Sequence, residues 1–526
     1  MPPRIDGVNN NQETFKPIKP KVEPPRVEPP RVEPQALNTT DKNLFLRQNS
    51  LGGDMLKISL FSRFNQTDVP ALVPTQQLNL VDPDKVEDAV ENIKDKLNES
   101  FLGDVSHGDL ESIQNTFEGL NSEEANEVFR QLSDDDLKKW ADELDGALGS
   151  FDTEEKKTLF DDLAGKLDGQ QLARLTNALG DDENIQSLSD SVANNASDAT
   201  IADLINRNQG AVENSEGRAV AVAELIAGLG DNPQMLESAL QDFTQTQLSA
   251  VIEATSQEEL HSVASPYGGS VYTTFDPAPL VDMLDAVSRT GNAELKANVF
   301  QAASLELKRI EEAGGFLNPA VGQDDAAGEV RNALTGLLQS DTTGIMRELE
   351  HNFRNGDGIT AYTKSMLNAG QTEELGNIIA QLSKGNGLTG DPLARFGTQV
   401  PGTDGNPHYQ NAQVLGYFAG ALFSGAKQIT SDRSEQADML KNIFGTIAGA
   451  TGAANPAAGV VSSVLNGLTQ GIVTEVTDGL NAGTMDMEEA LENLIFPRNT
   501  QTGDTYEGAA EADYDSAFSR VVLRNT

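Results

Sequence analysis

Apolar residues recur every three or four positions along most of this chain, and this period is typical of amphipathic helices. Between Asp84 and Leu97, for example, Val86, Val90 and Ile93 share one helical face with Leu97. The same pattern predicts further helices over Leu280–Ser288, Ala293–Ala313, Ala326–Leu338, Ile345–Phe353, Ile359–Leu367 and Leu375–Leu382. Leu and Ala dominate the apolar set, which also favours helices over sheets. The sequence therefore predicts a mostly α fold, either a multi-helix bundle or an irregular α-solenoid.

Helix starts are marked by side chains that accept hydrogen bonds from the first free backbone N–H groups. We expect such starts at Ser122, Ser133, Thr153 and Ser256, each followed within three residues by Asp or Glu. An Ala-Leu-Gly triplet, typical of a helix end, stands at 147–149 and again at 178–180. Recurring starts and ends indicate degenerate helical pairs stacked side by side, as in an α-solenoid.

Prolines and glycines divide the chain into segments. A repeat of Val-Glu-Pro, preceded in turn by Lys21, Arg26 and Arg31, favours a disordered, polyproline-like arm that acts as a spacer or as a docking segment. A break is also expected at Ser265–Pro279. The predicted organisation is a Pro-rich N-terminal arm at 1–50, a lead-in segment at 51–83, an acidic helical domain at 84–262, a second helical domain at 280–383, a Gly/Pro-rich linker at 384–407, a Gly/Ala-rich apolar helical region at 408–496 and a polar tail at 497–526.

Two long segments near the C-terminal end of the sequence, Gly405–Ala426 and Asn442–Thr474, carry no charged side chain. Small residues recur in them at every fourth position, which lets two helix backbones approach closely. The second segment is expected to form a helical hairpin about a turn at Asn455-Pro456. The residues predicted to serve helix packing are Gly416, Gly420, Gly445, Gly449, Gly467 and Gly471, and those predicted to supply apolar contact are Phe418, Phe423, Ile443, Phe444, Val460 and Leu465.

These uncharged segments have three interpretations. They form the buried core of a soluble domain, they insert into a target membrane, or they bind helices of a partner or of a second copy of the chain. The first arm of the hairpin, about 12 residues long, would reach roughly 18 Å, which is short of the ~30 Å hydrocarbon core of a bilayer. Partial insertion or oligomerisation is therefore the expected form of any membrane action.

The net charge of the chain limits the classes of partner that it can bind. The formal net charge is -43, although the first 50 residues carry 8 Lys or Arg against 6 Asp or Glu. So acidic a body repels phosphate backbones, which argues against nucleic acid as a partner. The chain has no Cys, which removes disulfides, thiolate catalysis and Cys-based metal sites. The residues after Met1 are polar and lack a signal-peptide core, so we expect any export to use a specialised bacterial system.

No motif for a reaction or a cofactor emerges. The run Asn355-Gly-Asp-Gly-Ile359 resembles the middle of a calcium-binding loop, but the matching end positions hold Phe353 and Lys364, so a helix-terminating turn is expected. The four histidines, His107, His261, His351 and His408, lack zinc-site spacing. His408, just before the first uncharged helix, is a candidate pH sensor. We therefore expect no cofactor, no metal and no enzymatic activity.

The Pro-rich arm, the acidic helical middle and the Gly/Ala-rich segments of residues 405–474 together resemble bacterial secreted effectors, in particular membrane-disrupting interbacterial toxins with glycine-rich helical hairpins. The resemblance implies a protein that is soluble before delivery and perturbs a target membrane, with a secretion machine or chaperone as partner. The alternative is a non-enzymatic scaffold, cargo or interaction protein whose Gly/Ala helices form a core or a homo-oligomer interface.

Overall fold

The computed structural model describes residues 81–98, 106–145, 151–255, 258–263, 270–313, 320–383, 399–401, 407–450, 468–495 and 508–525. These residues form 22 helices and five short strands. The helices of the first half are α2 (Pro83–Asn98), α3 (His107–Glu118), α4 (Ser122–Gln131), α5 (Asp134–Asp145), α6 (Thr153–Lys166), α7 (Gly169–Ala178), α8 (Asp182–Asn195), α9 (Asp198–Asn208), α10 (Glu216–Gly228), α11 (Pro233–Leu240) and α12 (Gln245–Thr255). Those of the second half are α13 (Ala278–Ser288), α14 (Ala293–Glu312), α15 (Gln323–Ser340), α16 (Thr342–Asn352), α17 (Asp357–Asn368), α18 (Thr372–Leu382), α19 (Gln410–Ile429), α20 (Arg433–Ala450), α21 (Gln470–Ala482), α22 (Met487–Ile495) and α23 (Gly508–Asn525).

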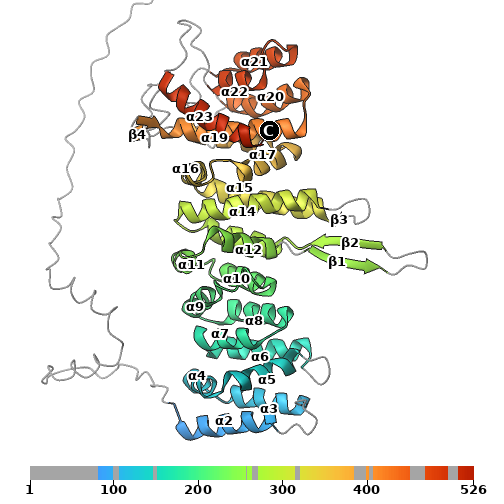
Figure 1. Ribbon diagram of the computed structural model, residues 1–526, viewed down its shortest axis with the longest axis vertical. Coiled ribbons are helices and arrows are strands. Elements are labelled where there is room, and N and C mark those ends of the chain that lie inside the picture. The colour runs from blue at the N-terminus through green and yellow to red at the C-terminus, as the bar shows by residue number, and fades with distance from the viewer. Residues whose placement is uncertain are drawn as a thin grey trace, which may run out of the picture. The chain divides into compact units, whose positions relative to one another are not determined.

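The helices stack in two layers. Each even-numbered helix from α2 to α20 packs on the next even-numbered one, and each odd-numbered helix from α5 to α17 packs on the next odd-numbered one. Figure 1 shows this succession within the unit that spans Leu78–Thr526. A recurring contact between a helix and the next but one, from α2 to α22 in the even series and from α5 to α19 in the odd series, defines an irregular α-solenoid. The mostly α fold predicted from the sequence is thus confirmed.

Amphipathic faces build the continuous core of this stack. In α2 the predicted residues Val86, Val90, Ile93 and Leu97 are all buried. Successive helices add their own apolar stripes to one cluster, which extends from Val86 into α23. Burying these stripes supplies the main stabilising contribution, because isolated helices of this length are marginal in water.

Polar side chains link helices that are three apart in the sequence. In each case a donor reaches the carbonyl groups at the C-terminal end of an earlier helix, which lack partners within that helix. The bonds are Lys166 Nζ to Phe117 O (2.9 Å), Arg174 Nη2 to Leu132 O (2.9 Å), Arg218 Nη2 to Thr176 O (3.3 Å), Arg289 Nη1 to Gly230 O (3.4 Å) and Tyr417 Oη to Phe353 O (2.8 Å). The recurrence of one bond type shows the repeat more clearly than the sequence does. In the four bonds made by Lys or Arg it also places a cation at the negative end of a helix dipole.

The helix starts agree with the sequence prediction to within one residue at two sites and in full at a third. The N-caps of α4 and α6 are Asn121 and Asp152, one residue before the predicted Ser122 and Thr153. Ser133 caps α5 as expected, since its Oγ accepts from the N–H of Asp136 at 3.1 Å.

The helix start expected at Ser256 is wrong, because strand β1 (Glu258–Val263) follows it instead. β1 pairs antiparallel with β2 (Ser270–Phe275), and β2 pairs in parallel with β3 (Ala320–Val321). Figure 1 shows the β1–β2 hairpin projecting from the helices. Strand β2 lies within the segment 265–279 that the sequence indicated as a break, and the β-branched and aromatic run at 271–275 is the strand signal there.

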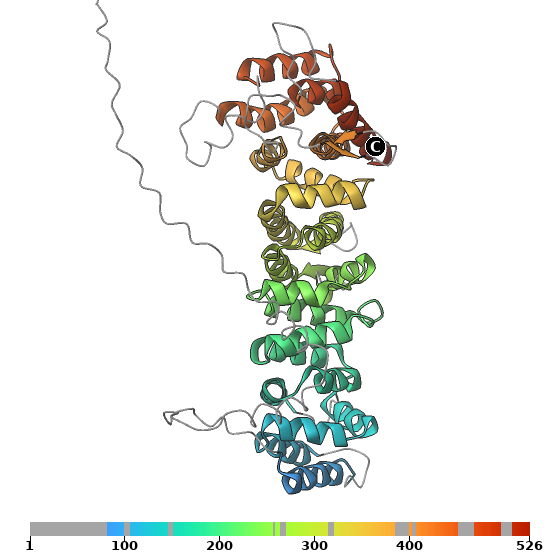
Figure 2. The same ribbon diagram turned by 90° about the vertical axis from the view of Figure 1, so that its left-hand side faces the viewer.

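The C-terminal helices α19–α23 gather beside α17 and α18, as both views show (Figures 1 and 2). Two short strands, β4 (Gln399–Pro401) and β5 (Pro407–Tyr409), pair antiparallel just before α19. β4 lies within the segment 384–407 that the sequence indicated as a linker, and β5 begins at its last residue. The expected hairpin turn at Asn455-Pro456 lies outside the described residues. The start of the second uncharged segment, residues 442–450, belongs to α20, which begins in the charged stretch before it.

Candidate functional site in the C-terminal helices

The small-residue stripe of α19 lies against α23. A Cβ atom placed on Gly416 would lie 2.1 Å from the carbonyl oxygen of Tyr514. One turn on, a Cβ atom on Gly420 would lie 2.8 Å from the carbonyl oxygen of Phe518. Both contacts are with backbone atoms, which cannot rotate away. The glycines therefore let two helix backbones approach closely, and the partner helix belongs to the same chain.

Helix α23 lies in the segment 497–526, which the sequence predicted to be a polar tail. Its apolar residues nevertheless follow the i, i+3, i+4, i+7 spacing of a helix face. All four are buried: Tyr514, Ala517, Phe518 and Val521. The spacing of these four residues is the signal that predicts a helix in this segment.

The opposite side of α19 packs on α16 and α17. Besides its bond to Phe353 O, buried Tyr417 has a pKa well above the ordinary value because burial disfavours its ionised form. A Cβ atom on Gly425 would lie 3.0 Å from the backbone nitrogen of Lys364, and Thr363 Oγ1 donates to Ala421 O at 3.0 Å. Helix α19 is thus enclosed by close backbone contacts on two sides.

A buried carboxylate ties the start of α19 to α23. Asp513, which is 6% exposed, accepts a hydrogen bond from the backbone N–H of Tyr409 at 2.5 Å through one oxygen. Its other oxygen pairs with Nδ1 of His408. The candidate pH sensor is therefore one half of a contact between strand β5 and α23.

The other predicted packing residues are distributed unevenly. Phe418, Ile443 and Phe444 are fully buried. Phe423 is partly buried and lies edge-on to Phe518, with ring centroids 5.5 Å apart. In contrast, a Cβ atom on Gly445 would meet nothing closer than Gln470 Oε1 at 3.9 Å.

The remaining predicted positions lie on α20, on α21 or outside the described residues. Gly471 is exposed on α21, and Gly449 lies near the end of α20. Gly467, Val460 and Leu465 lie outside the described residues. A glycine that the sequence reading did not select, Gly376 on α18, makes the close approach to α20, because its Cβ atom would lie 2.8 Å from Ile443 O. The structure thus places Gly416 and Gly420 in close backbone contact with α23, whereas Gly445 and Gly471 make no such contact with the described residues.

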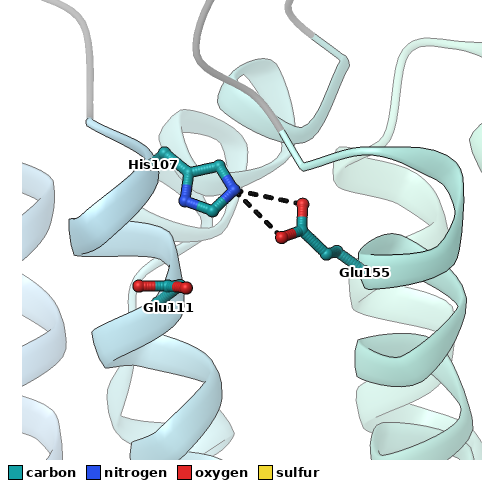
Figure 3. A group of neighbouring side chains, drawn as sticks. All are labelled: His107, Glu111 and Glu155. Atoms are coloured by element: carbon teal, nitrogen blue, oxygen red, sulfur yellow. Dashed lines mark hydrogen bonds and ion pairs between the residues drawn. The ribbon is translucent and has the colours of Figure 1, made fainter.

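A second group of polar side chains lies far from α19, between α3 and α6. His107 and Glu111 are one helical turn apart on α3, and His107 Nε2 lies 3.1 Å from both carboxylate oxygens of Glu155 (Figure 3). One ligand atom from each residue lies within 4.8 Å of the others, so the group offers three donors of the kind that a divalent cation such as zinc takes. The spacing His-x-x-x-Glu was visible in the sequence, whereas the contribution of Glu155 depends on the packing of α6.

The group is held together without an ion. Glu155 also completes the cap of α6, since its Oε2 accepts from the N–H of Asp152 at 2.9 Å. The side chains of His107 and Glu155 are 43% and 35% exposed. A surface contact that caps a helix accounts for this arrangement, and the geometry alone indicates no catalytic role.

Comparison with known proteins leaves the chain without a family: no family model matches it, and no curated protein matches its sequence. Among the described helices, none combines the length and the hydropathy that crossing a bilayer requires. The fold and the contacts given above are therefore the basis for a functional proposal.

Proposed function

We propose that this protein is a non-enzymatic interaction scaffold whose Gly/Ala-rich helices form its own core. The observation that carries the proposal is that the glycine stripe of α19 packs against α23. Gly416 contacts the backbone of Tyr514, and Gly420 contacts the backbone of Phe518. A stripe that is already occupied within the chain is not available to a membrane or to a partner helix. An α-solenoid offers a long series of exposed helix faces, the surface that repeat proteins use to bind other proteins.

The charge of the solenoid favours a basic partner. Between residues 81 and 260 Asp and Glu outnumber Lys and Arg by 41 to 12. A surface of one sign raises the association rate with a surface of the opposite sign and repels like-charged ones. A cationic protein, such as a component of a secretion machine or a chaperone, fits this surface, and delivery by a specialised bacterial system remains part of the proposal.

Perturbation of a target membrane is the second candidate, and one observation gives it a concrete form. Helix α19 contains a 20-residue segment with a single charged side chain, Lys427, and α23 covers its glycine stripe. Membrane action by α19 would require α23 to leave, which breaks the contacts of Asp513 with His408 and Tyr409. Under this proposal α23 is a removable cover.

Dye release from liposomes, measured beside thermal melting, separates the two proposals. The purified full-length protein and its Gly416→Leu variant are compared at neutral and mildly acidic pH, with vesicles of anionic and of zwitterionic lipid. For a scaffold we expect no release by the folded wild type and a lower melting temperature for the variant. Release by the wild type at either pH would support the membrane proposal and count against the scaffold.

A further inference from the structure

A cavity of about 690 Å³ lies where α23 meets the turn between α16 and α17. Three arginines line it, Arg354 from the turn and Arg520 and Arg524 from α23, together with Asn355 and Asp357. This is the turn that resembled the middle of a calcium-binding loop in the sequence. Its surroundings are instead cationic, in a chain whose formal net charge is -43.

The three guanidinium groups are incompletely neutralised by the described residues. Arg520 pairs with Glu350 through Nη2 at 2.5 Å, while its Nε is buried and has no hydrogen-bond partner there. Arg354 donates one long bond, 3.4 Å, to His351 O. Arg524 is exposed and makes no hydrogen bond or ion pair with any residue in the described ranges. Free Arg donors around one cavity match the oxygens of an anion in number and geometry.

The start of α17 adds backbone donors to the same cavity. Gly356, at a φ of 71°, is the N-cap of α17 and accepts no bond through a side chain, so the first N–H groups of the helix lack a side-chain cap. Asn355 and Asp357, the residues on either side of Gly356, both line the cavity. The positive end of a helix dipole with free N–H groups is a common phosphate site.

Asp357 is the opposing charge in the cavity, and its carboxylate accepts a hydrogen bond from Asn355 Nδ2. Glu350 neutralises Arg520, so two carboxylates stand against three arginines and the cavity keeps a net positive charge. A phosphate group, with up to two negative charges and three terminal oxygens, uses more of these donors than a planar carboxylate does.

We propose that this arginine cavity binds a compact organic phosphate or pyrophosphate ligand. Its volume falls in the range of small-molecule pockets and exceeds what a single phosphate ion fills. The ligand joins α23 to the α16–α17 turn, so binding would also hold α23 on the stack. This activity is independent of the proposed scaffold function, because no described residue of the cavity belongs to the acidic half of the solenoid.

Isothermal titration calorimetry with inorganic pyrophosphate, at 50 and 200 mM NaCl, tests the site on the full-length protein. Arg354→Gln and Arg524→Gln change exposed side chains and should leave the fold intact, as circular dichroism can verify. We expect pyrophosphate binding by the wild type and at least tenfold weaker binding by each variant. Arg130→Gln, an exposed arginine on α4, removes the same charge elsewhere and should change the affinity little.

Three outcomes would overturn the assignment. The first is that pyrophosphate gives no measurable binding heat with the wild-type protein. The second is that Arg130→Gln weakens pyrophosphate binding as much as the two cavity variants do. The third is that citrate binds as tightly as pyrophosphate, which would make the cavity a carboxylate site. A flotation assay with vesicles containing phosphatidic acid distinguishes the source of the phosphate. Arginine-dependent flotation would assign the phosphate to a lipid headgroup, and pyrophosphate binding without flotation would assign it to a soluble ligand.

Discussion

Gly416 of α19 and Tyr514 of α23 are packed so closely that a single added methyl group would lie 2.1 Å from the Tyr514 carbonyl oxygen. Nearly a hundred residues separate the two in the sequence. The pair therefore fixes a long-range helix contact through the absence of a side chain. It also explains why an acidic chain keeps α19 almost free of charge, since a charged side chain on this buried face would have neither space nor a counter-ion.

Gly416→Ala should destabilise the protein although alanine is the better helix former. The new Cβ atom must displace backbone on α23, and overpacking of this kind costs about 1–3 kcal/mol of unfolding free energy. Gly445→Ala is the matched control on α20, where the Cβ atom meets only Gln470 Oε1 at 3.9 Å. There the helix propensity of alanine should raise stability by roughly 0.5–1 kcal/mol. Urea denaturation of both variants measures the contrast, and equal effects would contradict the close packing.

Tyr417→Phe should lower the unfolding free energy by about 1–2 kcal/mol, because it leaves the Phe353 carbonyl at the end of α16 without its buried donor. The ring itself keeps its packing in the variant. Tyr409→Phe is the control, since the Tyr409 hydroxyl forms no hydrogen bond with the described residues. Chemical denaturation followed by circular dichroism gives both values. A loss no larger than that of the control would show that water satisfies the carbonyl equally well.

Glu224 on α10 should make the protein less stable as the pH rises. Burial and the nearby charge of Asp190 raise its pKa from 4.5 to about 8, so the folded protein binds a proton that the unfolded chain releases. This contribution is fully present below pH 4.5 and is lost progressively up to about pH 8. Glu224→Gln should therefore raise stability at pH 7 by an amount of the order of 2 kcal/mol and have little effect at pH 4.5.

Melting curves between pH 4.5 and 8.5 measure this difference. Glu216→Gln, on the exposed side of the same helix, removes one carboxylate without a buried environment and serves as the control. If Glu224→Gln and the wild type show parallel pH profiles, Glu224 is ionised in the folded protein at neutral pH and the assignment fails.

The helices could be predicted from the sequence because each depends on a local pattern. The face of Val86, Val90, Ile93 and Leu97 needs no knowledge of its neighbour to be recognised, and the structure buries all four residues. The alternation of even and odd helices could not be predicted in the same way. It depends on which helix faces pack against each other. The hydrogen bonds between helices are also long-range in the sequence, since the one from Arg174 to Leu132 O joins residues about 40 positions apart.

In the candidate site, too, the local pattern could be predicted from the sequence and the packing partner could not. The stripe through Gly416 and Gly420 was evident as a pattern, but identical spacing at Gly445 leads to no close contact. The four-residue spacing of glycines indicates that another helix can pack closely against this face. It does not indicate which helix does so. The arginine cavity could not be predicted from the sequence for a related reason. Arg354 and Arg520 come together only because α23 packs beside α17.

A disulfide between α19 and α23 should decide whether α23 ever leaves the stripe. The chain has no Cys, so Gly420→Cys with Val521→Cys introduces a single defined pair. A Cβ atom on Gly420 would lie 3.1 Å from the Cβ of Val521, slightly closer than the 3.5–4.5 Å of disulfides, so a small shift of α23 allows the bond. If membrane action requires release of α23, the oxidised protein should lose any dye-releasing activity that the reduced protein has.

The two single-cysteine variants control for the substitutions, and adding a reductant to the oxidised double variant controls for the bond itself. As an interaction scaffold, the protein should show the same absence of leakage whether oxidised or reduced. In that case the bond should raise the melting temperature, because it restricts the unfolded chain across a loop of about 100 residues. Leakage that is unchanged by oxidation would exclude the uncovering of α19 as its cause and direct attention to the residues of the second uncharged segment.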